Sequence, residues 1–282
     1  MNTQLIAIII FILTYIIIAT ERVSRTIVAF TGALMLLIFG VFDINEAIGF
    51  ISWETIGLLF GMFIIVAALS DAGFFKFLAL ILARRLKYSP VRIFIFFPVM
   101  TAVLSAFMAS VTVMLLFATL TYELCKMLKI NSTPLIITEV IMANIGGSAT
   151  MVGDPPNVIL GLKLGYYFND FVINNAPISI IAGAVTLLYC YLVCRKSIAP
   201  SGHIPKGEYE AMDPAEAIEN KRQLKIALAA LITAILFLIT HSFIEEYFHI
   251  PLTVPLAAMI PAFIMLIILG KRSEEILLKV DY

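Results

Sequence analysis

The segment that decides the fold runs from Pro134 to Leu164 and reads PLIITEVIMANIGGSATMVGDPPNVILGLKL. Both ends are apolar enough for helix, but the centre, Gly146 to Asn157, holds three glycines and two prolines. These two residue types are the least compatible with the interior of a continuous helix. The pattern therefore predicts a discontinuous helix over about 134–164.

The composition around this segment is that of a membrane protein. Of the 282 residues, 61% are hydrophobic and only 13% are charged, whereas soluble domains carry about 25% charged residues. Lys plus Arg and Asp plus Glu both number 19, so the basic surplus that nucleic-acid binding needs is missing. The three cysteines form no Cys-x-x-Cys or Cys/His cluster, which gives no basis for a disulfide framework or a zinc site. We expect neither a soluble enzyme nor a nucleic-acid partner, and no cofactor or metal.

The apolar runs predict an all-α polytopic membrane protein. A helix needs about 20 apolar residues to cross a bilayer. The first run lacks the basic n-region and the cleavage site of a signal peptide, so it is interpreted as a span. The simple spans are predicted at about 5–20, 26–42, 54–72, 177–194, 223–243 and 252–270.

The stretch from about 91 to 128 is too long for one crossing and has a small, polar centre. It predicts a re-entrant hairpin. Short cytoplasmic loops carry an excess of Lys and Arg, and the basic clusters fall on one side only if this hairpin returns to its side of entry. The amino terminus is then outside, and the basic, aromatic segment 74–87 is expected to be an amphipathic helix in the cytoplasmic interface.

A weak internal repeat relates 28–53 to 255–282, with the two following loops predicted on opposite sides of the membrane. This is the pattern of an inverted-topology repeat, although chance similarity is the alternative. On this interpretation 1–195 forms the first transport repeat with a preceding helix, and 196–222 is a cytoplasmic linker. The remaining 223–282 is the start of a second repeat, which looks truncated.

The motif from Glu139 to Asn157, with its Gly-Asp-Pro-Pro-Asn run, resembles the signature of the ArsB/NhaD and P-protein branch of the ion transporter superfamily. Dicarboxylate and citrate carriers share the fold of this branch. The resemblance covers essentially the whole chain, including the run from Ser52 to Phe63. It implies the amino-terminal part of an inverted-repeat carrier that works by alternating access. The implied cargo is sodium exchanged for protons, arsenite, or a carboxylate or other anion, with Na⁺ or H⁺ as the coupling ion.

An unwound helix at mid-membrane exposes carbonyls to a cation and a helix amino terminus to an anion. Asp154 is expected to cap the second half-helix, with Pro155 in its first turn. The alternative is that the glycines only permit close helix packing. The expected ion- or substrate-binding residues in the broken helix are Asn144, Gly146, Gly147, Ser148, Thr150, Gly153, Asp154 and Asn157.

The hairpin tip is the second ligand element that the resemblance implies. Family members usually carry an Asn there, but this chain has Ala-Ser-Val-Thr, so Ser105, Ser110 and Thr112 are the candidates. Their hydroxyls alternatively satisfy only helix backbone. Glu139 is a candidate for proton or cation coupling because it is ionisable at membrane depth, unless it lies near the surface and is solvated. Asp71 is expected to be a solvated helix end.

The predicted function is ion-coupled secondary transport of a small inorganic ion or a carboxylate, without enzyme activity. The predicted location is a lipid bilayer, that of a prokaryotic cytoplasmic membrane. The alternative is an inactive truncated or subunit-type membrane protein that needs a second polypeptide, or a homodimer, to transport. A channel would need rings of pore-lining charge, which the sequence lacks.

Overall fold

The structure, a computed structural model, describes residues 3–195, 197, 214–248 and 253–280. Within these ranges it is helical throughout, with thirteen α-helices, one short 3-10 helix and no strand. Four of the described helices are long and apolar enough to cross a membrane: α4 (Trp53–Asp71), α7 (Ser110–Met127), α10 (Phe168–Cys194) and α12 (Lys221–Phe248). The all-α, polytopic membrane class is therefore confirmed.

The chain divides into two compact units, Met1–Trp53 and Glu54–Tyr282. In the first unit, α1 (Thr3–Ala19) packs on α2 (Arg25–Ile38), and these two helices occupy the first two predicted spans. A seven-residue helix, α3 (Ile44–Phe50), follows. Its capping box joins Asp43 and Glu46, because each side chain accepts from the other residue's backbone N–H.

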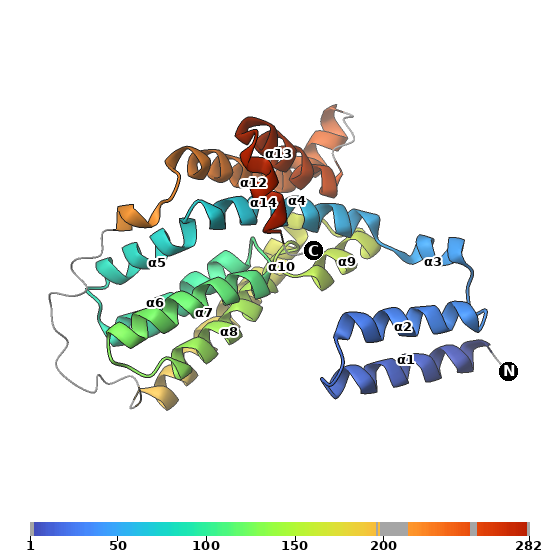
Figure 1. The fold of residues 1–282 in the computed structure, drawn as a ribbon, viewed down its shortest axis with the longest axis horizontal. Helices are drawn as coiled ribbons and strands as arrows, with labels where there is room; N and C mark the ends of the chain where they lie inside the picture. Colours follow the sequence, from blue (N-terminus) through green and yellow to red (C-terminus); the bar gives the residue numbers. More distant parts are fainter. Residues whose placement is uncertain (1–2, 196, 198–213, 249–252, 281–282) are drawn as a thin grey trace. The chain divides into compact units, whose positions relative to one another are not determined.

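The second unit begins with α4, and Gly73, with a φ of +82°, turns the chain into α5 (Phe74–Arg85). Next come α6 (Pro90–Ser105) and α7, joined by the short turn Ala106–Ala109 (Figure 1). This is the helix–turn–helix expected over 91–128. Sixteen residues of α6 are about 24 Å of helix, which falls short of a hydrocarbon core of about 30 Å.

The broken helix consists of α8 (Thr133–Gly147) and α9 (Pro155–Leu164), separated by the non-helical residues 148–154. α8 packs against α6, α7 and α10, so it lies directly beside the hairpin (Figure 1). The approach to α6 is close at Gly146, where a Cβ would overlap the backbone of Ala102. The glycine that interrupts the helical pattern therefore also brings the two elements together.

The helix that holds the predicted 177–194 span begins earlier, at Phe168, with Pro177 in its interior. Transmembrane helices tolerate such a proline when neighbouring groups compensate for the lost donor. Most of the predicted linker, residues 196 and 198–213, lies outside the described residues. Its last part forms the 3-10 helix η1 (Pro214–Ala217), which packs on α5.

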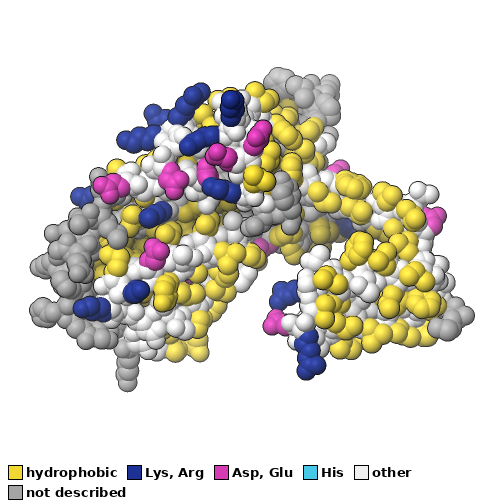
Figure 2. All heavy atoms as spheres, viewed as in Figure 1, with side chains coloured by type: hydrophobic (Ala, Val, Ile, Leu, Met, Phe, Trp, Pro, Cys, Tyr) yellow, Lys and Arg dark blue, Asp and Glu magenta, His cyan; other side chains and the backbone are white. Residues whose placement is uncertain are grey.

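The second unit continues through α12 into α13 (Val254–Leu269) and the seven-residue α14 (Arg272–Leu278). α12 packs on α13, and α13 crosses α4 closely, because a Cβ on Gly61 would lie 2.8 Å from the backbone of Ala258. Buried Leu58, Phe97 and Phe117 belong to the hydrophobic core. On the face shown in Figure 2, charged side chains gather over η1, the start of α12 and α14, and hydrophobic side chains cover much of the rest.

Candidate functional site

The tip of the hairpin and the break in the helix are joined by hydrogen bonds. The backbone N–H of Ser110 donates to the carbonyl of Gly153 over 3.3 Å, and the Ser110 hydroxyl donates to Asp154 Oδ1 over 2.6 Å. From the other side, the Thr150 hydroxyl donates to the carbonyl of Ala106. The structure thus brings the two elements that the sequence singled out into one junction, which we call the tip–break junction (residues 105–110 and 147–157).

Asn157 holds the break in shape from the first turn of α9. Its Nδ2 donates to the carbonyl of Gly147 over 3.1 Å and to that of Thr150 over 2.9 Å. These carbonyls lie at the end of α8 and beyond it, where no helical N–H is in place to pair with them. One amide side chain therefore spans the interruption and replaces helical hydrogen bonds that the break removes.

Asp154 stands at the N-cap of α9, as expected, but its side chain makes no capping bond. Its carboxylate instead accepts from Ser110, and it lies so close to Gly147 that a Cβ there would overlap it. A carboxylate has about four lone-pair positions. Asp154 therefore has acceptor capacity beyond the Ser110 hydroxyl at the centre of the junction.

Ser105, the last residue of α6, is fully buried, and its hydroxyl has no hydrogen-bond partner among the described residues. Its backbone carbonyl lies against Gly153, since a Cβ on that glycine would be 2.6 Å from the oxygen. A buried polar group without a partner costs about 1–3 kcal/mol. An ion or a water at the junction would remove that cost.

Other expected ligands lie outside this hydrogen-bonded group. Asn144 is exposed and its Nδ2 donates to Val140 of its own helix. Ser148 is also exposed, donates to Ile145, and lies 3.1 Å from the hydroxyl of Ser179 on α10. Thr112 is half-buried in the first turn of α7 and lines a cavity beside α4.

Glu139 is buried, with 1% of its surface exposed, so it is not the solvated carboxyl of the alternative interpretation. The Thr121 hydroxyl of α7 donates to its Oε1 over 2.7 Å, while Oε2 has no partner among the described residues. Thr121 was missed at the sequence level. Nothing local marks it, because its partner lies 18 residues away on another helix.

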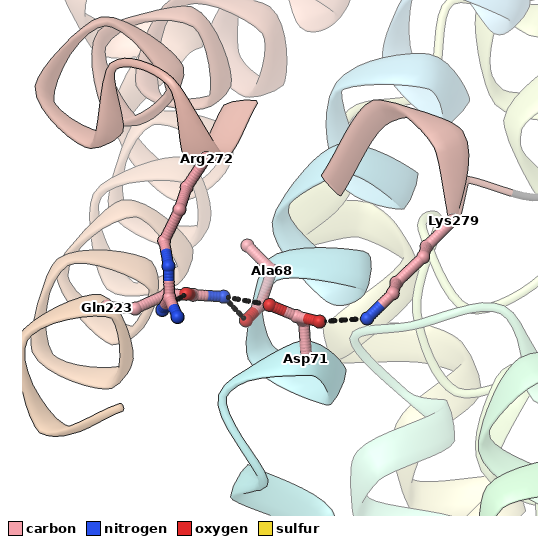
Figure 3. Close-up of polar contacts among 5 residues, drawn as sticks. All are labelled: Ala68, Asp71, Gln223, Arg272 and Lys279. Atoms are coloured by element: carbon pink, nitrogen blue, oxygen red, sulfur yellow. Dashed lines mark hydrogen bonds and ion pairs between the residues drawn. The ribbon is translucent and has the colours of Figure 1, made fainter. Parts of the chain in front are cut away.

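Asp71 also differs from expectation. Its side chain is only 12% exposed and pairs with Lys279, and Gln223 Nε2 donates to it over 2.9 Å. Gln223 and Lys279 come from parts of the chain far away in sequence (Figure 3), which explains why the local pattern of a charged residue at a helix end was misleading. Among the described residues, no group of three or more His, Cys, Asp or Glu is placed to hold a metal ion.

Comparison with known proteins adds a family and several relatives. The family model described as Citrate transporter matches residues 15–282. An uncharacterized transporter of Mycobacterium tuberculosis is 32% identical over 283 residues, which is 99% of this chain and 64% of that protein. A 46 kDa membrane protein of Mycobacterium leprae is 41% identical over 64% of this chain and 43% of its own length. The P protein of Homo sapiens is 38% identical over 64% of this chain and 22% of its own length. The chain thus spans somewhat less than two thirds of the first of these relatives.

Proposed function

The chain belongs to the citrate transporter family, and from that membership we propose that it forms part of an ion-coupled secondary carrier. The cargo is a small inorganic ion or a carboxylate, the coupling ion is Na⁺ or H⁺, and transport proceeds by alternating access. The hairpin and the broken helix supply one half of the binding site. The observation that carries the proposal is the set of hydrogen bonds joining the turn Ala106–Ala109 and Ser110 to the break.

Four helix ends meet at the tip–break junction, and each has backbone groups that its own helix leaves unpaired. α6 and α8 end there, at Ser105 and Gly147, whereas α7 and α9 begin there, at Ser110 and Pro155. Carbonyl ends of helices favour a cation, and amide ends favour an anion. The junction therefore offers backbone partners to a coupling cation and to an anionic cargo.

Side chains complete the proposed site. Asp154 has lone pairs beyond the one that Ser110 occupies, and the orphan hydroxyl of Ser105 lies in the same junction. We assign Ser105, Ser110 and Asp154 to the binding of the coupling cation. Asn157 and Thr150 act as positioning residues that hold the break. The other proposed binding residues are Asn144, Gly146, Gly147, Ser148, Gly153 and Thr112.

Glu139 is proposed as the residue that exchanges a proton during the cycle. Its carboxyl is buried between α8 and α7 with one hydroxyl partner, and an ionisable group in such a place is a functional candidate by default. A change in its protonation would alter the bond to Thr121. That bond links the broken helix to the hairpin, so proton exchange there would act on the two elements that form the site.

The experiment is ion flux in proteoliposomes that contain the purified chain, alone and together with a polypeptide that supplies the remaining length of the M. tuberculosis relative. Sodium and proton gradients are imposed in turn, with citrate, arsenite, phosphate and sulfate as cargo. The second arm tests whether a further polypeptide is needed. We expect gradient-dependent flux in at least one arm.

Two variants make the flux result specific to the site. Asp154→Asn is expected to abolish flux, because it removes the carboxylate at the centre of the junction. Thr119→Ala is the control, since Thr119 is exposed on α7 and its hydroxyl donates to the Leu115 carbonyl of its own helix. Absence of flux in both arms with folded protein, or full flux in Asp154→Asn, would overturn the proposal.

A further inference from the structure

Two adjoining cavities lie in the second unit, outside the junction. One, of about 200 Å³, is lined by residues of α4 and α7 together with Lys279, and it reaches Thr112. The other, of about 190 Å³, is lined by Asp71, Glu219 and Lys279. Both are lined by Ala67, Ser70 and Lys279, so they adjoin at these residues, and each is large enough for several waters.

The two cavities run from charged groups toward the tip–break junction. At one end are Asp71, Glu219 and Lys279. At the other is Thr112, in the first turn of the helix that begins with Ser110. Ser110 in turn donates to Asp154. The cavity therefore reaches the first turn of α7, the helix that begins with a residue of the proposed cation site.

A network of hydrogen bonds centred on Gln223 orients the charged side chains at this end of the cavities (Figure 3). Gln223, only 1% exposed, donates from Nε2 to the Ala68 carbonyl over 3.0 Å and to Asp71 over 2.9 Å. Its Oε1 accepts from Arg272 over 2.9 Å. Gln223 therefore has a defined orientation and holds the Asp71 carboxylate at this end of the cavities.

Lys279 is the loose member of the network. Its ammonium group pairs with the other oxygen of Asp71, and its side chain is 60% exposed. The bond and the charge of Asp71 raise the pKa of Lys279 above its ordinary value, so the lysine stays charged at neutral pH. An ion pair in which one partner is exposed to solvent contributes little to stability. Lys279 lines both cavities, so its movement away from Asp71 would change the size of the connection between them.

We propose that the Lys279–Asp71 pair gates a water-filled passage by which a small monovalent cation reaches the hairpin tip. This inference rests on the proposed function, because it supplies the access route to that site. The lining carries two carboxylates, Asp71 and Glu219, against one ammonium group. A passage with this balance of charge favours cations over anions.

The test is thiol labelling of Thr112→Cys in the purified full chain in detergent micelles. A small cationic methanethiosulfonate and its anionic sulfonate counterpart are compared, and mass spectrometry identifies the labelled peptide. The chain without Thr112→Cys provides the background from Cys125, Cys190 and Cys194. We expect slow labelling with the pair intact, and faster labelling by the cationic reagent than by the anionic one.

Opening the pair should raise the rate of cationic labelling at position 112 at least tenfold, in Asp71→Asn and in Lys279→Gln. The second variant changes an exposed side chain, so it remains informative if Asp71→Asn fails to fold. Glu21→Gln is the matched control, because it removes the exposed Arg25–Glu21 ion pair of the first unit and should leave the rate unchanged.

Equal labelling rates at position 112 with the Lys279–Asp71 pair intact and with the pair removed would overturn the gate. Faster labelling by the anionic reagent than by the cationic one would also overturn it. Labelling needs no transport, so the two proposals fail separately. If the chain transports ions but the labelling rate at position 112 is unchanged in Lys279→Gln, only the gate is overturned. If the labelling rate depends on Lys279 but no flux is found, only the proposed function is overturned.

Discussion

Gly73 connects α4 to α5 with a φ of +82°, in the left-handed region that costs other residues about 1–2 kcal/mol. A Cβ there would also overlap the carbonyl of Ala217, at the end of η1. Close by, the backbone N–H of Glu219 donates to the Ala72 carbonyl over 3.2 Å. We expect Gly73→Ala to lower the thermal unfolding midpoint in detergent, because it adds backbone strain and pushes the start of α12 away from α4.

The matched control for Gly73→Ala is Gly165→Ala. Gly165 has a φ of +70° at the end of α9, and nothing lies within 4 Å of the position that its Cβ would take. This variant therefore carries the backbone strain without the overlap and should unfold at a higher temperature than Gly73→Ala. Equal midpoints in the two variants would contradict the close packing of Ala217 on this turn.

Glu139 is the residue proposed to exchange a proton, and Thr121 donates to its carboxylate. Glu139→Gln keeps the size of the side chain and an oxygen that accepts from Thr121, but it cannot exchange a proton. We expect the variant to fold and to lose the dependence of flux on an imposed proton gradient. The control is Glu123→Gln, an exposed glutamate on α7. Proton-driven flux that persists in Glu139→Gln would exclude the coupling role of this residue.

The broken helix contains two asparagines, Asn144 and Asn157, that the sequence predicted equally as binding residues but that make different contacts in the structure. Asn157 spans the break with two hydrogen bonds, whereas Asn144 is exposed and donates to the Val140 carbonyl of its own helix. We expect Asn157→Ala to abolish flux and Asn144→Ala to lower it less. Asn174→Ala, which removes a similar bond within α10, should have no effect. Flux that persists in Asn157→Ala would show that transport does not depend on the hydrogen bonds of Asn157 across the break.

Elements that depend on nearby residues were predictable from the sequence. The break follows from glycines and prolines within a dozen residues, and the turn of the hairpin follows from its small, polar centre. α3 was missed because a seven-residue helix has too short a pattern, although Asp43 and Glu46 carry the capping-box spacing. The predicted span at about 177–194 covers the later part of α10, which begins at Phe168 and holds Pro177 in its interior.

Contacts between elements were not predictable in the same way. The bond from Thr150 to Ala106 and that from Ser110 to Asp154 each join residues 44 positions apart. A single sequence carries no signal for such pairs. The resemblance supplied the expectation that the hairpin tip and the break act together, and packing through Gly146 and Gly153 is what places them in contact.

Across the whole chain, the repeat stays a prediction, and two pairs of helices follow one another in the same order. In the first unit α2 is followed by Gly40, with a φ of +64°, and by the seven-residue α3. In the second unit α13 is followed by Gly270, with a φ of +60°, and by the seven-residue α14. The weak sequence similarity between 28–53 and 255–282 thus coincides with the same order of elements. Whether the two copies have opposite orientations in the membrane stays a prediction.

Helix lengths and charge together predict the membrane topology. α8 and α9, with 15 and 10 residues, are about 22 and 15 Å long. Neither crosses a core of about 30 Å alone, but the two in series do. The hairpin, in contrast, must return to its side of entry if the basic clusters before α6 and at the end of α7 are both cytoplasmic. The two ends of the hairpin should therefore share one side, and α9 should end on the other.

Single cysteines at three exposed basic positions test this topology: Arg84 before the hairpin, Lys126 at its end and Lys163 at the end of α9. With a membrane-impermeant thiol reagent on sealed vesicles of one orientation, we expect Arg84→Cys and Lys126→Cys to label from the same side and Lys163→Cys from the other. Labelling of the first two from opposite sides would mean that the hairpin crosses the membrane. The tip–break junction could then not lie at mid-membrane, and the proposed site would lose its physical basis.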